Sequence, residues 1–438
     1  MGSSKPQTTT FDGTIFTTFK GKGNANAVFG GTLPGDGDDH GDLDHLDHLD
    51  HLDHLDHLDH LVVRSRLRAR PSARDPRLAG LEARMWSRRG VTQDLEKVDD
   101  AHIQYAETVV APLLGAQYLA RARRVALDPP LRLLGDDITF VDSGVIMADG
   151  TLLTKRLKER VVCIEIKPKF GGLVHCATVH GRHRHLKKST SRYQLHQVLK
   201  LQQGAIDRVS AYDPLDLFSG DPERMQAALE ALMDVPQNNL ALFLGGDRVD
   251  PIGQTGIEAA CAVLGRATSS HLAATVRDVL VHEGVLDKLL QMQTLCKYDV
   301  HAVELLCRRL IGDPDDSDDY KHSDESKDGT TYDCTAMNAF LDRVAGDESR
   351  RLDVLADYCI AATARDCSIL VAMTLDAGNS PTKQGISPRQ LGIVGDIAYR
   401  VTVVDLDIKP LEKLAVHKRL DLDILRANNA NDDINSGR

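Results

Sequence analysis

Apolar and polar positions alternate in the first part of the chain as they do in strands. Residues 13–31 form two strand-like segments around a glycine-rich turn, and residues 61–66 resume the pattern. Between them, Asp-His-Leu repeats six times, ending at Leu61. A period of three matches neither strand nor helix, so we expect residues 42–61 to form a solvated insertion inside a hairpin of a small sheet.

The rest of the chain has mostly helical periodicity, interrupted by apolar runs typical of buried strands. Helical patterns cover residues 76–127, 191–205, 221–233, 257–308 and 334–365. Strand patterns cover residues 137–147, 161–166, 368–375 and 398–406. This order predicts an α+β fold with two lobes, a small sheet-rich N-lobe of residues 1–150 and a larger mixed C-lobe of residues 151–438. A nucleotide would bind in the cleft between them.

Composition and charge narrow the classes of partner. The net charge of -11 over 438 residues argues against a nucleic-acid or membrane-surface binder, and no apolar run reaches the roughly 18 residues of a membrane span. The eight cysteines contain no Cys-x-x-Cys pair, which fits a reducing compartment. Residues 155–200 are basic, whereas residues 311–330 are acidic and are expected to form a loop. A basic region inside an acidic protein indicates a compact anionic ligand.

The glycine-rich turn is the first candidate for phosphate binding. It reads Gly-x-Gly-Asn-x-Asn at 21–26, and an arginine, Arg64, follows on the next strand. Glycines let backbone N–H groups approach a phosphate, and a cation on the neighbouring strand can pair with it. The turn is not a P-loop, because Gly-Lys-Ser/Thr is absent. Taken alone, the pattern is also that of an ordinary structural hairpin.

A strand that ends in two lysines is the strongest single signal. Glu-Ile-Lys-Pro-Lys at 165–169 closes an apolar run. Strand geometry would send Lys167 and Lys169 to one face, and Pro168 would fix the backbone between them. Two aligned ammonium groups predict a phosphate site; the alternative is a solvated basic edge.

Two further segments could extend this anion site. Arg192, His196 and Lys200 recur at the spacing of one helix face. Asn238 and Asn239 precede an apolar strand, where their amides could donate to a phosphate. Each pattern also has a plain structural reading, as a solvated helix face or as a capped turn.

Two acidic segments could supply the chemistry. Asp366 lies between a helical pattern and an apolar strand, where a general base could sit, although a turn aspartate would look the same. Asp405 and Asp407 alternate at the end of another strand, and paired carboxylates suit magnesium. Lys409 and Lys413 follow at helical spacing.

Together and in this order, these segments resemble the inositol-pentakisphosphate 2-kinase family, which makes inositol hexakisphosphate. The motifs that carry the resemblance include the glycine-rich turn, Glu-Ile-Lys-Pro-Lys, Tyr-Asp-Pro-Leu-Asp-Leu-Phe-Ser-Gly at 212–220, Arg-Asp-Cys-Ser at 365–368 and Asp-Leu-Asp-Ile-Lys-Pro at 405–410. The resemblance spans roughly residues 13–425 and is thin at 76–128 and 245–355. It implies a two-lobed fold distantly like that of protein kinases.

The resemblance implies an ATP- and Mg²⁺-dependent kinase that phosphorylates the 2-hydroxyl of inositol 1,3,4,5,6-pentakisphosphate. ATP would be held by Gly21, Gly23, Asn24, Asn26, Val62, Arg64 and Asp149. The substrate phosphates would be held by Arg132, Lys167, Lys169, Lys200, Asn238, Asn239, Lys409 and Lys413. Asp366 would take the proton from the accepting hydroxyl, and Asp405 and Asp407 would bind magnesium.

Two departures from the family pattern bear on substrate binding. Lys413 stands where members often have arginine, and His417 stands where an aromatic phosphate contact is usual. Lysine cannot make the bidentate fork of arginine, so one phosphate could be held less firmly. The sequence leaves two alternatives open: a kinase of another inositol polyphosphate, and a non-catalytic inositol-phosphate-binding protein with a kinase-like fold. We expect a cytoplasmic or nuclear monomer with no nucleic-acid or membrane partner.

Overall fold

The computed structural model describes most of the chain. The described residues are 10–12, 18–22, 26–31, 61–66, 75–92, 98–133, 139–175, 181–313, 334–344, 346–375 and 391–435. Residues 42–60 of the Asp-His-Leu tract and residues 314–330 of the acidic segment lie outside them, as do Gly23 and Asn24.

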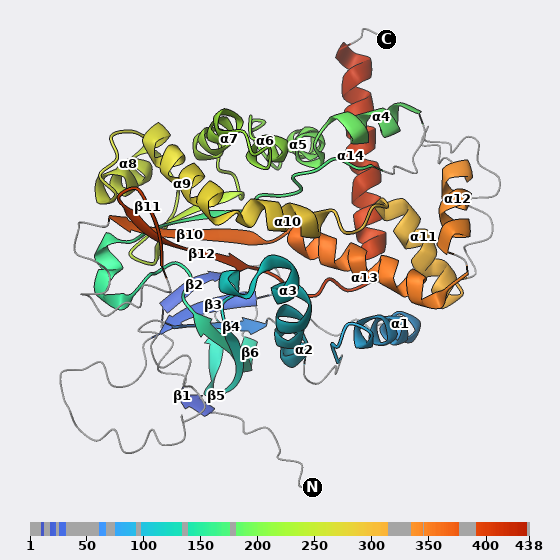
Figure 1. Cartoon of the computed structure of the whole chain (residues 1–438), viewed down its shortest axis with the longest axis horizontal. Helices are drawn as coiled ribbons and strands as arrows, with labels where there is room; N and C mark the ends of the chain where they lie inside the picture. The colour runs from blue at the N-terminus through green and yellow to red at the C-terminus, as the bar shows by residue number, and fades with distance from the viewer. Residues whose placement is uncertain are drawn as a thin grey trace.

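The first sheet has six strands in the order β1-β5-β6-β4-β3-β2 (Figure 1). Their bounds are β1 (Thr10–Asp12), β2 (Thr18–Lys22), β3 (Asn26–Gly31), β4 (Leu61–Arg66), β5 (Ala122–Leu133) and β6 (Thr139–Ala148). β3 pairs antiparallel with β4, and Gly31 lies opposite Leu61. The Asp-His-Leu tract therefore connects two neighbouring antiparallel strands, which confirms the predicted hairpin.

Three short helices follow β4 in the chain: α1 (Pro76–Ser87), α2 (Val98–Tyr105) and α3 (Ala111–Leu114). α1 begins where Asp75 accepts a hydrogen bond from the Arg77 N–H and Pro76 opens the first turn. The prediction of helix up to residue 127 is wrong from Ala122 onward. The Arg-Arg-Val-Ala-Leu sequence there pairs with β6 instead, because cross-strand pairing outweighs its weak helical preference.

The second sheet is antiparallel throughout its described strands, in the order β11-β12-β10-β7-β8-β9. Its strands are β7 (Val162–Ile166), β8 (Leu240–Leu244), β9 (Asp247–Val249), β10 (Ser368–Leu375), β11 (Gly392–Val394) and β12 (Ile397–Val404). β7 and β10 lie at its centre and are buried along nearly their whole length, as their unbroken apolar runs predicted.

The remaining helices follow β7 in the chain. They are α4 (Gly181–Ser189), α5 (Arg192–Gln202), α6 (Pro214–Leu217), α7 (Pro222–Asp234), α8 (Gln254–Val263), α9 (Ser269–Glu283), α10 (Val285–Gln293), α11 (Val300–Ile311), α12 (Cys334–Val344), α13 (Glu348–Ala364) and α14 (Lys413–Asn435). The helical pattern at 257–308 is divided into four helices. Gly284 breaks it with a left-handed backbone, and Asp299 caps the start of α11.

One large hydrophobic core joins the two halves of the chain. Trp86, Tyr105 and Leu114 from α1–α3 are fully buried in the same cluster as residues of α10, α11 and α13. Figure 1 shows the first sheet and α1–α3 on one side of the second sheet and α5–α7 on the other. Among the described helices, none is both long and apolar enough to cross a membrane. The fold is therefore α+β as predicted, while the division at residue 150 stays a prediction.

Candidate active site

The loop after β7 carries the two lysines that the sequence singled out. β7 ends at Ile166, and Lys169 has a left-handed backbone with φ of 60°. Lys169 lines a cavity of about 440 Å³, whereas Lys167 does not. The expectation that strand geometry sends both lysines to one face is therefore wrong, because the strand stops before them and the backbone turns.

The two asparagines take different positions. Asn238 is exposed and lines the cavity. Asn239 is buried, and its Nδ2 donates to the Lys167 carbonyl at 3.2 Å, while the Lys167 N–H donates to the Asn239 carbonyl at 2.8 Å. Asn239 thus faces the backbone of the loop, and Asn238 faces the cavity.

The cavity has more basic than acidic side chains in its wall. The cations are Lys169, Lys187, Arg192, Lys200, Lys297, Arg365 and Lys409, and the acids are Asp299, Asp366 and Asp421. Arg192, His196 and Lys200 reach the cavity from one face of α5, as their spacing predicted. Such a wall favours a ligand with several negative charges.

Three histidines line this cavity, and two of them, His196 of α5 and His417 of α14, come from helices. Burial, together with Arg192 and Lys200, lowers the pKa of His196 to about 4. Burial, together with Arg192 and Lys409, likewise lowers the pKa of His417 to about 4. Both imidazoles are therefore neutral near pH 7, and a bound polyanion would favour their protonation.

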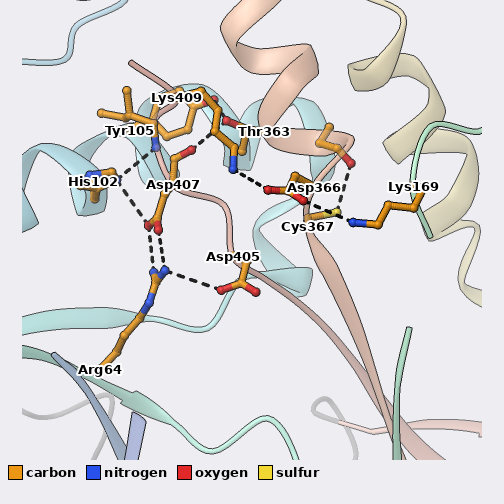
Figure 2. Close-up of polar contacts among 12 residues, drawn as sticks. Arg64, His102, Tyr105, Lys169, Thr363, Asp366, Cys367, Asp405, Asp407 and Lys409 are labelled. Carbon is orange, nitrogen blue, oxygen red and sulfur yellow. Dashed lines mark hydrogen bonds and ion pairs between the residues drawn. The ribbon is translucent and has the colours of Figure 1, made fainter. Parts of the chain in front are cut away.

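Asp366 lies at the edge of the cavity, directly after α13. Its carboxylate contacts the Lys409 Nζ at 2.9 Å and the Lys169 Nζ at 3.4 Å (Figure 2). Burial acts to raise the pKa of this carboxyl, but the charges of Lys409 and Lys169 outweigh burial and hold the pKa below its usual value. Asp366 is thus an ionised carboxylate between two ammonium groups.

Arg64 of β4 pairs with both predicted metal ligands, which lie in the segment after β12. The Arg64 guanidinium forms a two-pronged ion pair with Asp407, with Nη1 and Oδ1 2.8 Å apart, and lies 3.6 Å from Asp405 (Figure 2). Burial acts to lower the Arg64 pKa, but Asp407 and then Asp405 outweigh it and raise the pKa. Asp405, like Lys169, has a left-handed backbone, with φ of 62°.

Three groups from elsewhere in the chain fix the backbone of this segment. The Thr363 hydroxyl donates to the Asp407 carbonyl at 2.8 Å. The Ile408 N–H donates to His102 Nδ1 at 3.1 Å, so that nitrogen carries no proton to share with Asp407 3.4 Å away. The Leu411 N–H donates to buried Glu82 at 2.6 Å.

The two carboxylates fit a magnesium ion to different degrees. The Asp405 side chain is 46% exposed, and within the described part of the chain its ion pair is the long contact to Arg64, so its oxygens can accept a hard cation. Both oxygens of Asp407 already accept bonds from Arg64. No group of three or more metal-ligating side chains occurs among the described residues. Magnesium that is held by one or two carboxylates plus substrate phosphates needs no such group.

The residues expected to bind ATP lie mostly on the first sheet. Gly21, in β2, lies opposite Val28 at an irregularity of the β2–β3 pairing, and Asn26 begins β3. Val62 is buried in β4. Asp149 follows β6, and its Oδ1 accepts from the N–H and the hydroxyl of the nearby Thr151. Asp149 therefore caps a turn.

Two predicted substrate contacts lie away from the cavity wall or cannot be placed. Lys413 begins α14, is exposed and does not line the cavity. Arg132 lies on β5 opposite Phe140, and its side chain is outside the described part of the structure. The sequence argument also missed Lys297 and Arg365 as cavity residues. The Arg-Asp-Cys-Ser motif was a signal for Arg365, whereas no motif marked Lys297.

A buried ion network forms one side of the cavity and was also missed. Lys187 of α4 contacts Asp421 of α14 at 2.8 Å and Asp299 at 3.4 Å, and His301 Nε2 lies 2.9 Å from Asp421. Burial acts to raise the pKa of Asp421, but Lys187 and His301 outweigh burial and hold the pKa well below its usual range. The network neutralises Lys187, so this lysine supports the wall rather than attracting a ligand.

Comparison with known proteins agrees with this geometry. A family model described as inositol-pentakisphosphate 2-kinase matches residues 19–423. The chain is similar to the inositol-pentakisphosphate 2-kinase of Arabidopsis thaliana, with 31% identity over 358 residues that cover 74% of this chain and 76% of the relative. It is also similar to the inositol-pentakisphosphate 2-kinase of Danio rerio, with 26% identity over 74% of this chain and 82% of the relative. This chain belongs to the inositol-pentakisphosphate 2-kinase family.

Proposed function

We propose that this chain transfers the γ-phosphoryl group of ATP to the 2-hydroxyl of inositol 1,3,4,5,6-pentakisphosphate and releases inositol hexakisphosphate. One observation carries the proposal beyond family membership. Asp366, an ionised carboxylate, lies on a cation-rich cavity and pairs with Lys409. Lys409 belongs to the same segment as Asp405 and Asp407, which pair with Arg64 of β4. A base, a phosphate-binding wall and a metal-binding carboxylate thus adjoin one another.

The substrate matches the charge of the cavity. Each phosphate carries roughly -1.5 to -2 charges near pH 7, so five phosphates need many cations. Lys169, Lys200, Lys409 and Asn238 are the predicted contacts that line the cavity. Lys167, Asn239 and Lys413 would contribute from its rim or through the backbone, and Arg132 stays a predicted contact. A volume of about 440 Å³ is in the range of small-molecule sites.

Asp366 would accept the proton of the attacking hydroxyl. Its lowered pKa makes it a weak base that is always ionised near pH 7. That suffices for phosphoryl transfer, in which positioning and charge neutralisation contribute most of the catalysis. Substrate phosphates would also attract Lys169 and Lys409, which would leave the Asp366 carboxylate freer to take the proton.

ATP would lie against the first sheet, with its phosphates near Arg64. Backbone N–H groups around Gly21 and Asn26, the buried side chain of Val62 and the turn at Asp149 would hold the nucleotide. Asp405 would hold magnesium, with Asp407 as a second ligand once phosphates compete for Arg64. Magnesium, when bound, neutralises charge on the phosphates.

The first sheet would then form the ATP-binding lobe of a fold distantly like that of protein kinases. The packing of α1–α3 in the large core suggests that these helices move with the C-lobe, although they precede residue 150. In this arrangement the Arg64–Asp407 ion pair crosses between the lobes.

Product analysis tests the function directly. Purified protein, ATP and Mg²⁺ are incubated with each of several inositol phosphates, and the products are identified by phosphorus NMR. We expect inositol hexakisphosphate from inositol 1,3,4,5,6-pentakisphosphate alone. Transfer to another inositol phosphate would replace the proposed substrate, and binding of the pentakisphosphate without any binding of Mg²⁺–ATP would indicate a non-catalytic binding protein.

A further inference from the structure

The backbone of the Lys167–Lys169 loop is held by side chains from three other parts of the chain. Its three consecutive carbonyls each accept a hydrogen bond from a different residue. Asn239 Nδ2 donates to residue 167 at 3.2 Å, the Tyr212 hydroxyl donates to residue 168 at 2.7 Å, and Gln293 Nε2 donates to residue 169 at 2.8 Å. Such a set fixes the path of the loop without any ligand.

All three donors are buried. Asn239 is 1% exposed, and Tyr212 and Gln293 are fully buried. A buried amide or hydroxyl costs free energy unless its hydrogen bonds are made, and an apolar side chain would fill the same space at less cost. The polar groups are therefore best explained by the bonds that they donate to the loop.

Gln293, the last residue of α10, does more than the other two. Its Oε1 accepts from the Gly171 N–H at 2.9 Å, and its Nε2 also donates to the Ala364 carbonyl at 3.1 Å. Its own carbonyl accepts two bonds from Arg365, at 3.1 and 2.6 Å. The side chain of Gln293 thus ties the Lys169 loop to Ala364, and its backbone carbonyl holds Arg365, the residue before Asp366.

The loop needs this support because its conformation is locally unfavourable. Left-handed backbone costs a residue other than glycine roughly 1 kcal/mol, and Lys169 adopts it. Two residues later, a Cβ on Gly171 would lie 2.1 Å from the ring of Phe218. The backbone conformation of this loop is therefore determined by the residues that pack against it and not by its own local preference.

We propose that Gln293 is a positioning residue that fixes the Lys169 ammonium group and the Asp366 carboxylate relative to each other before the substrate arrives, with Tyr212 and Asn239 holding the rest of the loop. Gln293 does not line the cavity and acts only through the backbone. The inference rests on the proposed function, since it takes Lys169 as a phosphate contact and Asp366 as the base. Small misplacements of such groups can cost up to about 100-fold in rate.

Two substitutions of Gln293 test the proposal. Gln293→Met removes all three side-chain bonds at similar volume, and Gln293→Glu keeps the acceptor for Gly171 but loses both donors. We expect a KM for inositol pentakisphosphate about tenfold higher and a lower kcat, because three hydrogen bonds are lost and each is worth up to about tenfold. The KM for ATP should stay within about twofold, because ATP is expected on the first sheet. Gln293→Glu should be impaired at least as much as Gln293→Met, because its buried carboxylate would face the Lys169 and Ala364 carbonyls.

Tyr399→Phe is the matched control. It also removes buried hydrogen bonds, to His282 at 2.6 Å and to Glu283 at 2.8 Å, but on β12 where it pairs with Met373, several residues from Asp366. We expect it to lower the melting temperature and to leave both KM values unchanged. If Gln293→Met behaves as Tyr399→Phe does, Gln293 is only structural and the proposal is overturned.

A milder variant and a binding measurement complete the test. Tyr212→Phe removes one hydroxyl and should raise the KM for inositol pentakisphosphate by a few-fold. If Gln293→Met does not fold, the Tyr212→Phe variant tests the proposal in its place. An unchanged KM in Tyr212→Phe would then overturn the proposal. Calorimetric titration with inositol pentakisphosphate, without ATP, should show the same ranking of affinities. A wild-type protein that neither binds nor phosphorylates it overturns both the function and this inference, whereas an active wild type with unaltered Gln293 variants overturns the inference alone.

Discussion

The site is carried by two segments that are held in place by different chemistry. The β7 loop (167–171) and the β12 segment (405–411) each follow a strand of the second sheet. Each contains a non-glycine residue with a left-handed backbone, and each contributes a lysine to Asp366. Neutral, buried hydrogen bonds hold the β7 loop, whereas the β12 segment is also held by the ion pair between Asp407 and Arg64.

This difference has consequences for how each segment works. Buried neutral hydrogen bonds are little affected by salt or by charged ligands, so the β7 loop is a fixed part of the substrate wall. The Arg64–Asp407 pair has side chains that are 20% and 24% exposed, and phosphates or a metal ion can compete for either partner. We therefore predict that the ionic partners of the β12 segment change when nucleotide binds.

The largest effect is expected at Asp366, where the two segments meet. Asp366→Asn removes the base and should lower kcat by about 10²- to 10⁴-fold, while the fold and the affinity for inositol pentakisphosphate are retained. Production of inositol hexakisphosphate, circular dichroism and calorimetry measure the three properties. Asp396→Asn is the control, because Asp396 also pairs with an arginine, Arg266, but at the far end of β12. Normal turnover by Asp366→Asn would rule out its role as base.

A substitution of Arg64 should change the KM for ATP more than the KM for inositol pentakisphosphate. Arg64→Gln removes the two-pronged pair and the proposed phosphate contact, a loss of about 1.5–3 kcal/mol, so the KM for ATP should rise about tenfold or more. The KM for inositol pentakisphosphate should change little, the reverse of the expectation for Gln293→Met. Initial rates over a matrix of both substrates test this. Equal changes in both KM values would contradict the division of roles.

The sequence predicted the parts of this comparison that depend on local pattern. The strands at 161–166 and 368–375, the hairpin around the Asp-His-Leu tract and the basic face of α5 were all readable, because each has a clear apolar period or spacing. The wrong helix at 122–127 shows the limit of that method, since a short run without strong preference takes the structure of its neighbours.

What could not be predicted depends on contacts between distant parts of the chain. No local rule gives Lys169 a left-handed backbone, because lysine does not favour that region. Aspartate enters it more often than most residues, but the sequence does not mark which aspartate does so. Gln293 lies 124 residues from the carbonyl it supports, and Lys187 lies 234 residues from Asp421. A single sequence carries no sign of such pairings, which is why the support of the site was missed while its lysines and aspartates were found.

A smaller effect is expected at Asp405, where a substitution should stabilise the fold and at the same time remove activity. Asp405→Gly should relieve the left-handed strain and raise the free energy of unfolding by about 0.5–1 kcal/mol, after the higher chain entropy of glycine is subtracted. The same change should abolish Mg²⁺-dependent turnover, because it removes the proposed ligand. Urea unfolding and activity assays give the two readings. No gain in stability in Asp405→Gly would mean that the left-handed backbone of Asp405 stores no strain.

The smallest effect is expected from the two cavity histidines that lie on helices, His196 and His417. His196 is faced by Arg192, Lys200 and Lys169, and His417 by Arg192, Lys409 and Lys413 with Asp366 in opposition. Their pKa values of about 4 lie below the ordinary 6.5, so the unfolded chain binds more protons between these values and stability falls as pH falls.

From pH 7 to pH 6 we expect the two histidines together to cost about 0.5 kcal/mol of stability, allowing for solvent screening. Bound inositol pentakisphosphate should raise both pKa values and flatten or reverse this slope. Thermal unfolding at both pH values, with and without ligand, measures it. The double change His196→Gln and His417→Gln should remove most of the ligand's effect on the slope, and His271→Gln on exposed surface should not. An unchanged slope with ligand would mean that neither imidazole senses the phosphates, and that the wall binds them through the lysines and arginines alone.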